Sequence, residues 1–230
     1  MLGLSPDELT AVRLSLRVAT WATLASLPLG LAVALILARG RFWGHGLLNV
    51  LVHLPLVLPP VVTGYILLLL LGRRGPVGQW LDQTFGIVVA FRWTGAVIAS
   101  AVMGFPLLVR AIRLSIEAVD LRLEAAARTL GAAGPWVFLT VTLPLILPGI
   151  VAGMILCFAK SLGEFGATIT FVSAIPGETR TLPAAIYSLT QVPGGEAAAL
   201  RLTLVAVFLA MLALLASEVV ARRVAARVAE

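Results

Sequence analysis

Five long apolar stretches, separated by shorter polar segments, give this chain its main pattern of hydrophobic and polar positions. They cover about residues 11–38, 47–71, 95–112, 145–165 and 202–224. Each is close to or longer than the roughly 20 apolar residues that an α-helix needs to cross a bilayer. The pattern predicts one all-α domain over residues 1–230, a polytopic membrane helical bundle with about five transmembrane helices.

The composition supports the same class. Mean hydropathy is +1.04, and 60% of the residues are hydrophobic while only 12% are charged. These polar groups are too few to cover the core of a soluble domain. The net charge of +6 lies in separate loops without a basic stripe of interleaved aromatics, so it fits anionic lipid headgroups and predicts no nucleic-acid partner. The one cysteine, Cys157, is far in sequence from both histidines, so no metal site is expected.

A polar, helix-forming island at residues 123–144 separates the third and fourth stretches. Asp120 is placed to cap a short helix over residues 120–130, and Gly131 stands where that helix would end in a left-handed turn. Glu124 and Arg128, four residues apart, are predicted to pair. Alanines on this helix would let another protein approach closely, so we interpret it as a docking element. The alternative is an interfacial helix packed on its own chain.

The second apolar stretch carries helix-breaking residues at its centre. Hydrocarbon tolerates a broken helix only where protein or a water-filled cavity satisfies the released carbonyls. A break here is predicted to line a translocation path or gate, and the alternative is a proline kink that serves packing. The candidate residues are Pro59, Pro60, Thr63 and Gly64.

The fourth stretch contains two ionisable residues, Lys160 and Glu164, four apart on one helical face. Ionisable groups at membrane depth are unfavourable and usually pair or face a cavity. Together with Ser161 and Thr168 of a small and polar strip, we interpret them as part of the translocation path or of a dimer contact. The alternative is an ion pair near the outer interface.

Two further segments flank the apolar core. Residues 166–200 are interrupted by Pro176, Pro183 and Pro193, and are predicted to form an external loop with a short helix near residues 182–190. Near the N-terminus, Ser5 and Glu8 have the spacing of a capping box, which predicts a helix leading into the first stretch rather than a cleaved signal peptide.

The distribution of arginines gives little information on topology. Five crossings would place the termini on opposite sides of the membrane. Nine arginines, including those at 222, 223 and 227, fall on the side of the C-terminus and seven on the other side. The positive-inside rule is therefore nearly balanced.

The chain lacks the motifs of an enzyme. It has no glycine-rich phosphate-binding loop ending in Lys and Ser or Thr, no Gly-x-Ser-x-Gly and no His-Glu-x-x-His. We expect no hydrolysis by this chain and no bound cofactor. A secondary transporter or channel is the alternative from another class, and inverted internal repeats, which the sequence does not show, would favour it.

The polar island resembles the EAA loop of ABC importer permeases. Two alanines precede a glycine, and after nine intervening residues come an aliphatic residue and Leu-Pro. The resemblance implies that residues 113–144 form a cytoplasmic coupling loop docking on a partner ATPase. The residues concerned are Glu124, Ala126, Ala127, Arg128, Gly131, Val141, Leu143 and Pro144. The chain departs from the family at one position, because the family's glutamate falls on Ala125 and Glu124 lies one residue earlier.

Other segments are similar to the molybdate branch of these permeases, notably HLPLVLPPVVTGY (53–65), GEFGATITF (163–171) and GETRTLP (177–183). The resemblance implies the type I ABC importer permease fold and a homodimer in the bacterial inner membrane. It also implies two ATPase subunits that bind ATP and Mg²⁺, and a periplasmic or extracellular binding protein that delivers the oxyanion. The N-terminus would be outside and the C-terminus cytoplasmic. Molybdate is the expected substrate, with tungstate and sulfate as alternatives.

Overall fold

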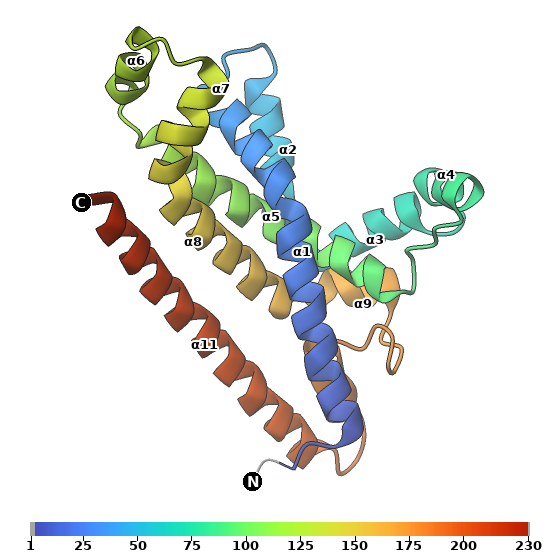
Figure 1. The fold of residues 1–230 in the computed structure, drawn as a ribbon. Helices are drawn as coiled ribbons and strands as arrows, with labels where there is room; N and C mark the ends of the chain where they lie inside the picture. The colour runs from blue at the N-terminus through green and yellow to red at the C-terminus, as the bar shows by residue number, and fades with distance from the viewer. Residues whose placement is uncertain (1–2, 230) are drawn as a thin grey trace.

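The computed structural model describes residues 3–229, and every regular element in them is a helix (Figure 1). In chain order the elements are α1 (Pro6–Arg39), α2 (His45–Val57), α3 (Pro60–Leu71), α4 (Pro76–Phe85), α5 (Trp93–Glu117), α6 (Leu121–Thr129), α7 (Gly134–Val137), the π-helical turn η1 (Phe138–Thr142), α8 (Leu143–Leu162), α9 (Gly166–Val172), α10 (Leu182–Thr190) and α11 (Glu196–Ala229). The predicted all-α class is confirmed.

Four helical segments in the described part of the chain are long and apolar enough to cross a membrane. They are α1, α5, the run of α7, η1 and α8 over Gly134–Leu162, and the Glu196–Ala216 part of α11. The fifth apolar segment consists of α2 and α3, which are bent by 114° at the break between them. The length of residues 47–71 alone would predict one continuous crossing, but the structure shows two helices instead. The helix break predicted inside this stretch is confirmed.

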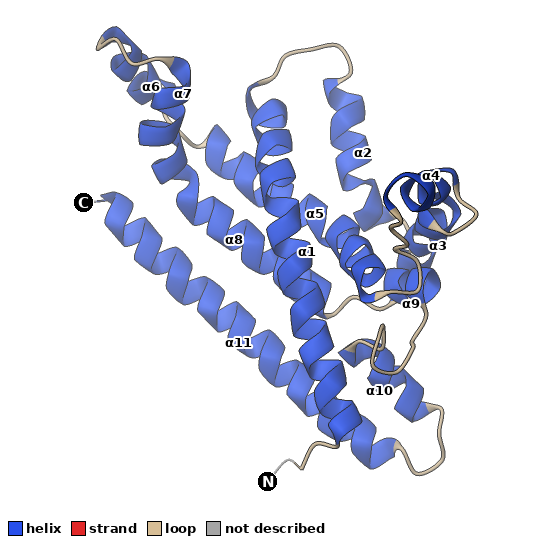
Figure 2. Cartoon of the chain, turned by 45° about the vertical axis from the view of Figure 1, so that its right-hand side comes forward, coloured by secondary structure: helices blue, strands red, loops and turns tan. Residues whose placement is uncertain are grey.

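The bend between α2 and α3 follows from two consecutive prolines. The N–H of Leu58 donates to the carbonyl of Leu54 at 3.0 Å and closes α2. Neither Pro59 nor Pro60 has an N–H that could continue the helix, and Pro60 occupies the first turn of α3, where no donor is needed. In Figure 2, α3 turns away from α2 toward α4 and α9.

The core forms where α1, α5 and α8 pack against one another. Its largest cluster of buried side chains includes Leu37, Leu108, Ile112, Ile116 and Ile146. The helix α11 runs beside α8 (Figure 1), and α10 packs between α11 and the beginning of α1. These contacts leave α2, α3 and α4 on one flank of the bundle, where much of their apolar surface is exposed.

The predicted capping box at the start of α1 is confirmed. The N–H of Ser5 donates to Oε2 of Glu8 at 2.6 Å, and the N–H of Glu8 donates to Oγ of Ser5 at 3.2 Å. Nη2 of Arg201 also donates to Oε1 of Glu8 at 2.9 Å. One buried carboxylate thus fixes the first turn of α1 and joins it to α11.

Residues 166–200, predicted to be an external loop, begin with a helix packed inside the bundle. This helix is α9, which lies against α3 and α5. The turn-rich part begins after α9, at Ser173, whose φ is +63°. The short helix predicted near residues 182–190 is confirmed as α10, and its first residue, Leu182, donates its N–H to Oγ of Ser15 at 2.6 Å.

The two ends of the chain lie at opposite ends of the bundle, and α6 lies at the end that holds the C-terminus (Figures 1 and 2). This arrangement agrees with an odd number of crossings. The arginines at 222, 223 and 227, which contributed to the charge count, have side chains outside the described part of the molecule.

Candidate functional site

The helix α6 has the ends that its sequence predicts. Oδ1 of Asp120 accepts the N–H of Arg122 at 2.9 Å, which caps the first turn. The helix ends at Thr129, and Gly131 follows with φ +86°. The next N–H, that of Ala132, donates to the carbonyl of Ala127 at 3.2 Å. A Cβ atom at position 131 would meet no neighbouring atom within 4 Å, so the glycine serves the backbone turn and not the packing.

The surface of α6 is open. None of its residues is buried, and the leucine that follows it, Leu130, has 89% of its surface exposed. Leu121 and Leu123 are also exposed large apolar residues on this polar helix. Exposed leucines on a short helix mark a surface that another protein can cover. The contacts of α6 with α7 and η1 hold it at the end of the bundle without hiding this surface.

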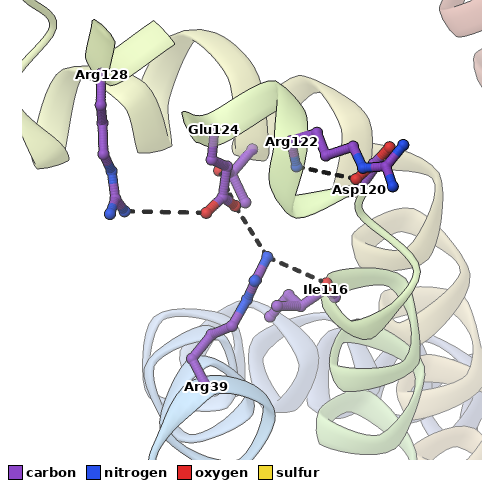
Figure 3. Close-up of polar contacts among 7 residues, drawn as sticks. Arg39, Ile116, Asp120, Arg122, Glu124 and Arg128 are labelled. Carbon is purple, nitrogen blue, oxygen red and sulfur yellow. Dashed lines mark hydrogen bonds and ion pairs between the residues drawn. The ribbon is translucent and has the colours of Figure 1, made fainter. Parts of the chain in front are cut away.

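Glu124 is the exception on α6, because it points inward and forms the centre of a polar cluster (Figure 3). Its side chain is only 13% exposed. Oε1 accepts from Nη2 of Arg39 at 2.9 Å and from Oγ1 of Thr142 at 2.9 Å. Oε2 lies 4.0 Å from Nη2 of Arg128, so the ion pair predicted from their spacing is present at long range. One carboxylate therefore joins α6 to the end of α1 and to η1.

Arg39 extends this cluster to α5. Its Nη2 also donates to the carbonyl of Ile116 in the last turn of α5, at 3.5 Å. A cationic side chain is favourable there because the carbonyls at a helix C-terminus carry partial negative charge. Sequence reasoning missed both Arg39 and Thr142. Arg39 lies 85 residues before Glu124 in the chain, and no local pattern connects them.

A cavity of about 630 Å³ lies beneath α6. Its lining includes Arg39, Glu124, Arg128, Val137 and Thr142. Of the other residues predicted for this site, Ala127, Val141 and Leu143 are half-buried, and Ala126 and Pro144 are exposed. Pro144 cannot donate an N–H to the carbonyl of Thr140, and the helix widens to the π-helical turn η1 just before it.

A second candidate site forms where α3 crosses α9. A Cβ atom added to Gly64 would collide with the backbone of Ala167, and one added to Gly166 would lie 2.7 Å from Cβ of Pro60. Only glycine allows two helices to approach this closely. The structure thus brings together the two path segments predicted separately from the second and fourth apolar stretches.

The pair formed by Lys160 and Glu164 lies at the break between α8 and α9. Nζ of Lys160 donates to Oε2 of Glu164 at 2.8 Å. Oε1 of Glu164 accepts the N–H of Ala167 at 3.0 Å, so the same carboxylate satisfies a donor in the first turn of α9. The side chain of Glu164 is 1% exposed, whereas that of Lys160 is 31% exposed. The glutamate is therefore a structural partner inside the bundle, and the lysine reaches its surface.

Hydroxyl groups surround this break. Oγ of Ser161 donates to the carbonyl of Ser100 on α5 at 3.2 Å, and Oγ1 of Thr168 donates to the carbonyl of Phe165 at 2.9 Å. Thr63 on α3 is buried, and its hydroxyl has no partner among the described residues. Pro59 precedes α3 as its N-cap residue. All eight residues predicted for the path lie in the α2–α3 and α8–α9 segments that meet here.

Comparison with known sequences gives a consistent result. The profile of the family described as "Binding-protein-dependent transport system inner membrane component" matches residues 26–229. The chain is 60% identical over 220 residues to the molybdenum transport system permease protein ModB of Escherichia coli strain K12, covering 95% of this chain and 96% of that protein. It is 56% identical over 216 residues to ModB of Haemophilus influenzae, covering 94% of each.

Solved structures share the fold at much lower identity. A bacterial ABC transporter involved in the import of the acidic polysaccharide alginate has a chain that matches with a TM-score of 0.76 and 19% identity, over 96% of this chain and 81% of that one. A structure of bacterial alginate ABC transporter, in complex with a periplasmic protein bound to an alginate pentasaccharide, matches with a TM-score of 0.73 and 18% identity, over 96% and 80% of the two chains. The predicted importer permease fold is thereby confirmed.

The cluster around Glu124 predicts that α6 depends on Arg39 for its position. Replacing Glu124 by Gln should loosen α6, because a half-buried ion pair of about 1 kcal/mol is lost, and should speed hydrogen exchange in residues 121–129 about fivefold. Arg39→Gln should have the same effect, and the double variant should be no worse than either single one. Arg122→Gln is the control, since only the backbone of Arg122 takes part in a described contact. If Arg122→Gln accelerated hydrogen exchange in residues 121–129 as much as Glu124→Gln does, this role of the ion pair would be contradicted.

The pair at the α8–α9 break predicts an asymmetry between single and double neutralisation. Lys160→Met leaves a buried carboxylate without its cation and should lower the free energy of unfolding by about 2 kcal/mol. Adding Glu164→Gln should recover most of that loss, because the amide oxygen can still accept the N–H of Ala167. Denaturant unfolding of the purified protein in detergent measures both. Equal losses in the single and double variants would indicate that the pair is solvated.

Proposed function

This chain belongs to the family of binding-protein-dependent transport system inner membrane components, and we propose that it is the translocating subunit of an ABC importer for molybdate. The identity of 60% to an Escherichia coli molybdenum permease along nearly the whole chain is the observation that carries the proposal. Tungstate, a tetrahedral dianion of similar size, would use the same path. Sulfate is the alternative substrate, although the relatives at 60% and 56% identity are both molybdenum permeases.

The proposed source of energy is a partner. The chain is a membrane permease without an ATP-binding motif of its own, so ATP and Mg²⁺ would bind to two cytoplasmic ATPase subunits. The open surface of α6 would dock on an ATPase, with Ala126 and Ala127 allowing close approach and Arg128 available for polar contact. Glu124 would hold α6 against α1 and η1 instead of contacting the ATPase, consistent with its position one residue before the family's glutamate.

The connection from α6 into the membrane is short. Gly131 reverses the chain after α6, and the segment through Val141, Leu143 and Pro144 leads directly into α8. The far end of α8 carries Lys160 and Ser161 at the candidate path. Movement of a docked α6 would therefore reach the path through one helix of 20 residues. Alternating access would result when paired bundles rock about their common axis.

A second copy of this chain would complete the path. The apolar side chains of α2 and α3 are widely exposed, among them Leu51, Val57, Val61 and Tyr65. Such surface needs either lipid or protein against it, and a homodimer would supply protein on one side. In this arrangement α6 faces the cytoplasm, the C-terminus is cytoplasmic, and the N-terminus and α10 lie outside the inner membrane, where a binding protein would deliver the oxyanion.

Within the path, the attraction between the protein and the oxyanion must be weak enough for the oxyanion to be released. Lys160 offers one ammonium group whose charge is balanced by Glu164 at 2.8 Å. Thr63, Thr168 and Ser161 would add hydroxyl groups nearby, while Pro59, Pro60 and Gly64 would shape the break through which the oxyanion passes. A path with a single balanced charge would guide a dianion without trapping it.

The turn after α6 provides a test of coupling. Gly131→Val should reduce molybdate uptake and substrate-stimulated ATPase activity at least severalfold, because a β-branched residue at φ +86° strains the turn. The membrane bundle should stay folded, since the position has open space around it. Gly134→Ala is the matched control, as it lies nearby in open space without a positive φ. Uptake that remains at the wild-type level in Gly131→Val would exclude this role of the turn.

The substrate is tested by reconstitution. The chain would be assembled in liposomes with its ATPase and binding protein, and ATP hydrolysis titrated separately with molybdate, tungstate and sulfate. We expect stimulation by molybdate and tungstate and little by sulfate. Stimulation by sulfate alone would assign the sulfate alternative. Absence of stimulation, together with ion flux through this chain alone, would indicate a channel or secondary transporter.

A further inference from the structure

A polar cleft lies between α2 and α5, apart from both sites described above. Its volume is about 330 Å³, and it is lined by Asn49, His53, Arg110, Arg113, Leu114 and Glu117. Apart from Leu114, every lining side chain is polar or charged, although both helices are largely apolar. Such a concentration of polar groups between two membrane helices needs a reason.

Most charges in the cleft are balanced within it. Nη1 of Arg113 donates to Oδ1 of Asn49 at 3.0 Å, and Nε donates to Oε1 of Glu117 at 2.7 Å. The ring of His53 bonds through Nδ1 to the carbonyl of Asn49 at 2.9 Å. Arg110 is exposed and makes no hydrogen bond or ion pair within the described part of the chain. The cleft therefore presents one free guanidinium group, and Asn49 lines the same cleft.

The cleft lies well inside the end of the bundle. Arg110 is seven residues before the end of α5, and His53 is eight residues after the start of α2, so they lie about 10–12 Å along these helices. This is the end that carries α6, which begins four residues after α5 ends. An unpaired arginine on a membrane helix is stable where it reaches water, a polar partner or a lipid phosphate.

The polar side chains also face away from the chain's own core. Another cavity, of about 430 Å³, lies on the α1 side of the same two helices, and its lining is almost wholly apolar, including Leu51, Val52, Val102 and Phe105. At 100° per residue, the two sets of side chains lie about 120° apart around each helix. The cleft thus opens away from this apolar cavity and from α1.

We infer that this cleft is an oxyanion site in the inner half of the path, occupied by molybdate or tungstate on its way to the cytoplasm. The inference rests on the proposed function. A guanidinium group binds two oxygens of a tetrahedral anion through parallel N–H bonds, and the amide of Asn49 can donate a third, since its oxygen is already taken by Arg113. Glu117 limits the net charge, so the anion is held loosely and released.

The first test measures whether the cleft meets water and the substrate. Leu114 also lines the cleft and is exposed, so Leu114→Cys in a Cys157→Ala background places the one cysteine of this chain there and leaves Arg110 in place. The complete transporter in nanodiscs would be treated with a charged, water-soluble thiol reagent. We expect labelling that tungstate slows. Absence of labelling, or labelling that responds to removal of anionic lipid but not to tungstate, would overturn the inference, the latter by assigning Arg110 to a lipid phosphate.

The second test separates this site from the proposed function as a whole. Arg110→Gln should lower molybdate uptake about tenfold, because the local attraction for the dianion is lost. Stimulation of the ATPase by the loaded binding protein should persist, and Arg110→Lys should restore part of the uptake. The control, Arg41→Gln, removes one exposed arginine from the α1–α2 loop and should change neither. If the Arg110→Gln transporter takes up molybdate at the wild-type rate while its ATPase is stimulated normally, the site is excluded. A wild-type transporter without stimulation would instead count against the proposed function.

Discussion

Inside a bilayer, a backbone or charged group without a partner is strongly destabilising, and this constraint governs how the helix breaks in this protein are arranged. The chain is interrupted between α2 and α3 and again between α8 and α9. The two interruptions lie together, with Gly64 against Ala167 and Gly166 against Pro60. Glu164 accepts the N–H of Ala167 in the first turn of α9 and takes Lys160 as its cation. Each break is therefore stable because the other one covers it.

The two candidate sites are connected through α8. At the α6 end, Glu124 gathers α1, α5 and η1 through Arg39 and Thr142. From there α8 continues to the α8–α9 break, packed along its length against α1 and α5. A close-packed apolar core transmits displacement with little deformation. In the proposed function, α8 is therefore the mechanical link between the proposed docking helix α6 and the proposed path, and the polar clusters at its two ends hold it in place.

Polar clusters occur at three levels along this bundle. Glu124 and Arg39 lie at the α6 end, Arg110 and His53 lie about 10–12 Å inside it, and Lys160 and Glu164 lie at the α8–α9 break. Each group contains one carboxylate. Glu124 pairs with Arg39, Glu164 pairs with Lys160, and Glu117 pairs with Arg113. For a path that carries a dianion, this distribution combines attraction with release, because no group presents more than one unbalanced positive charge.

Local patterns determined much of this protein. Apolar length predicted the membrane helices, Pro59 and Pro60 predicted the break, and Asp120 with Gly131 predicted both ends of α6, because each effect acts within a few residues of its cause. The ion pairs at four-residue spacing were also predictable. Tertiary structure alone decided that Arg39 meets Glu124 across 85 residues, that α3 crosses α9 at two glycines, and that Arg110 and Asn49 share one cleft. Contacts between distant segments depend on how whole helices pack, and no periodicity along the chain encodes that packing directly.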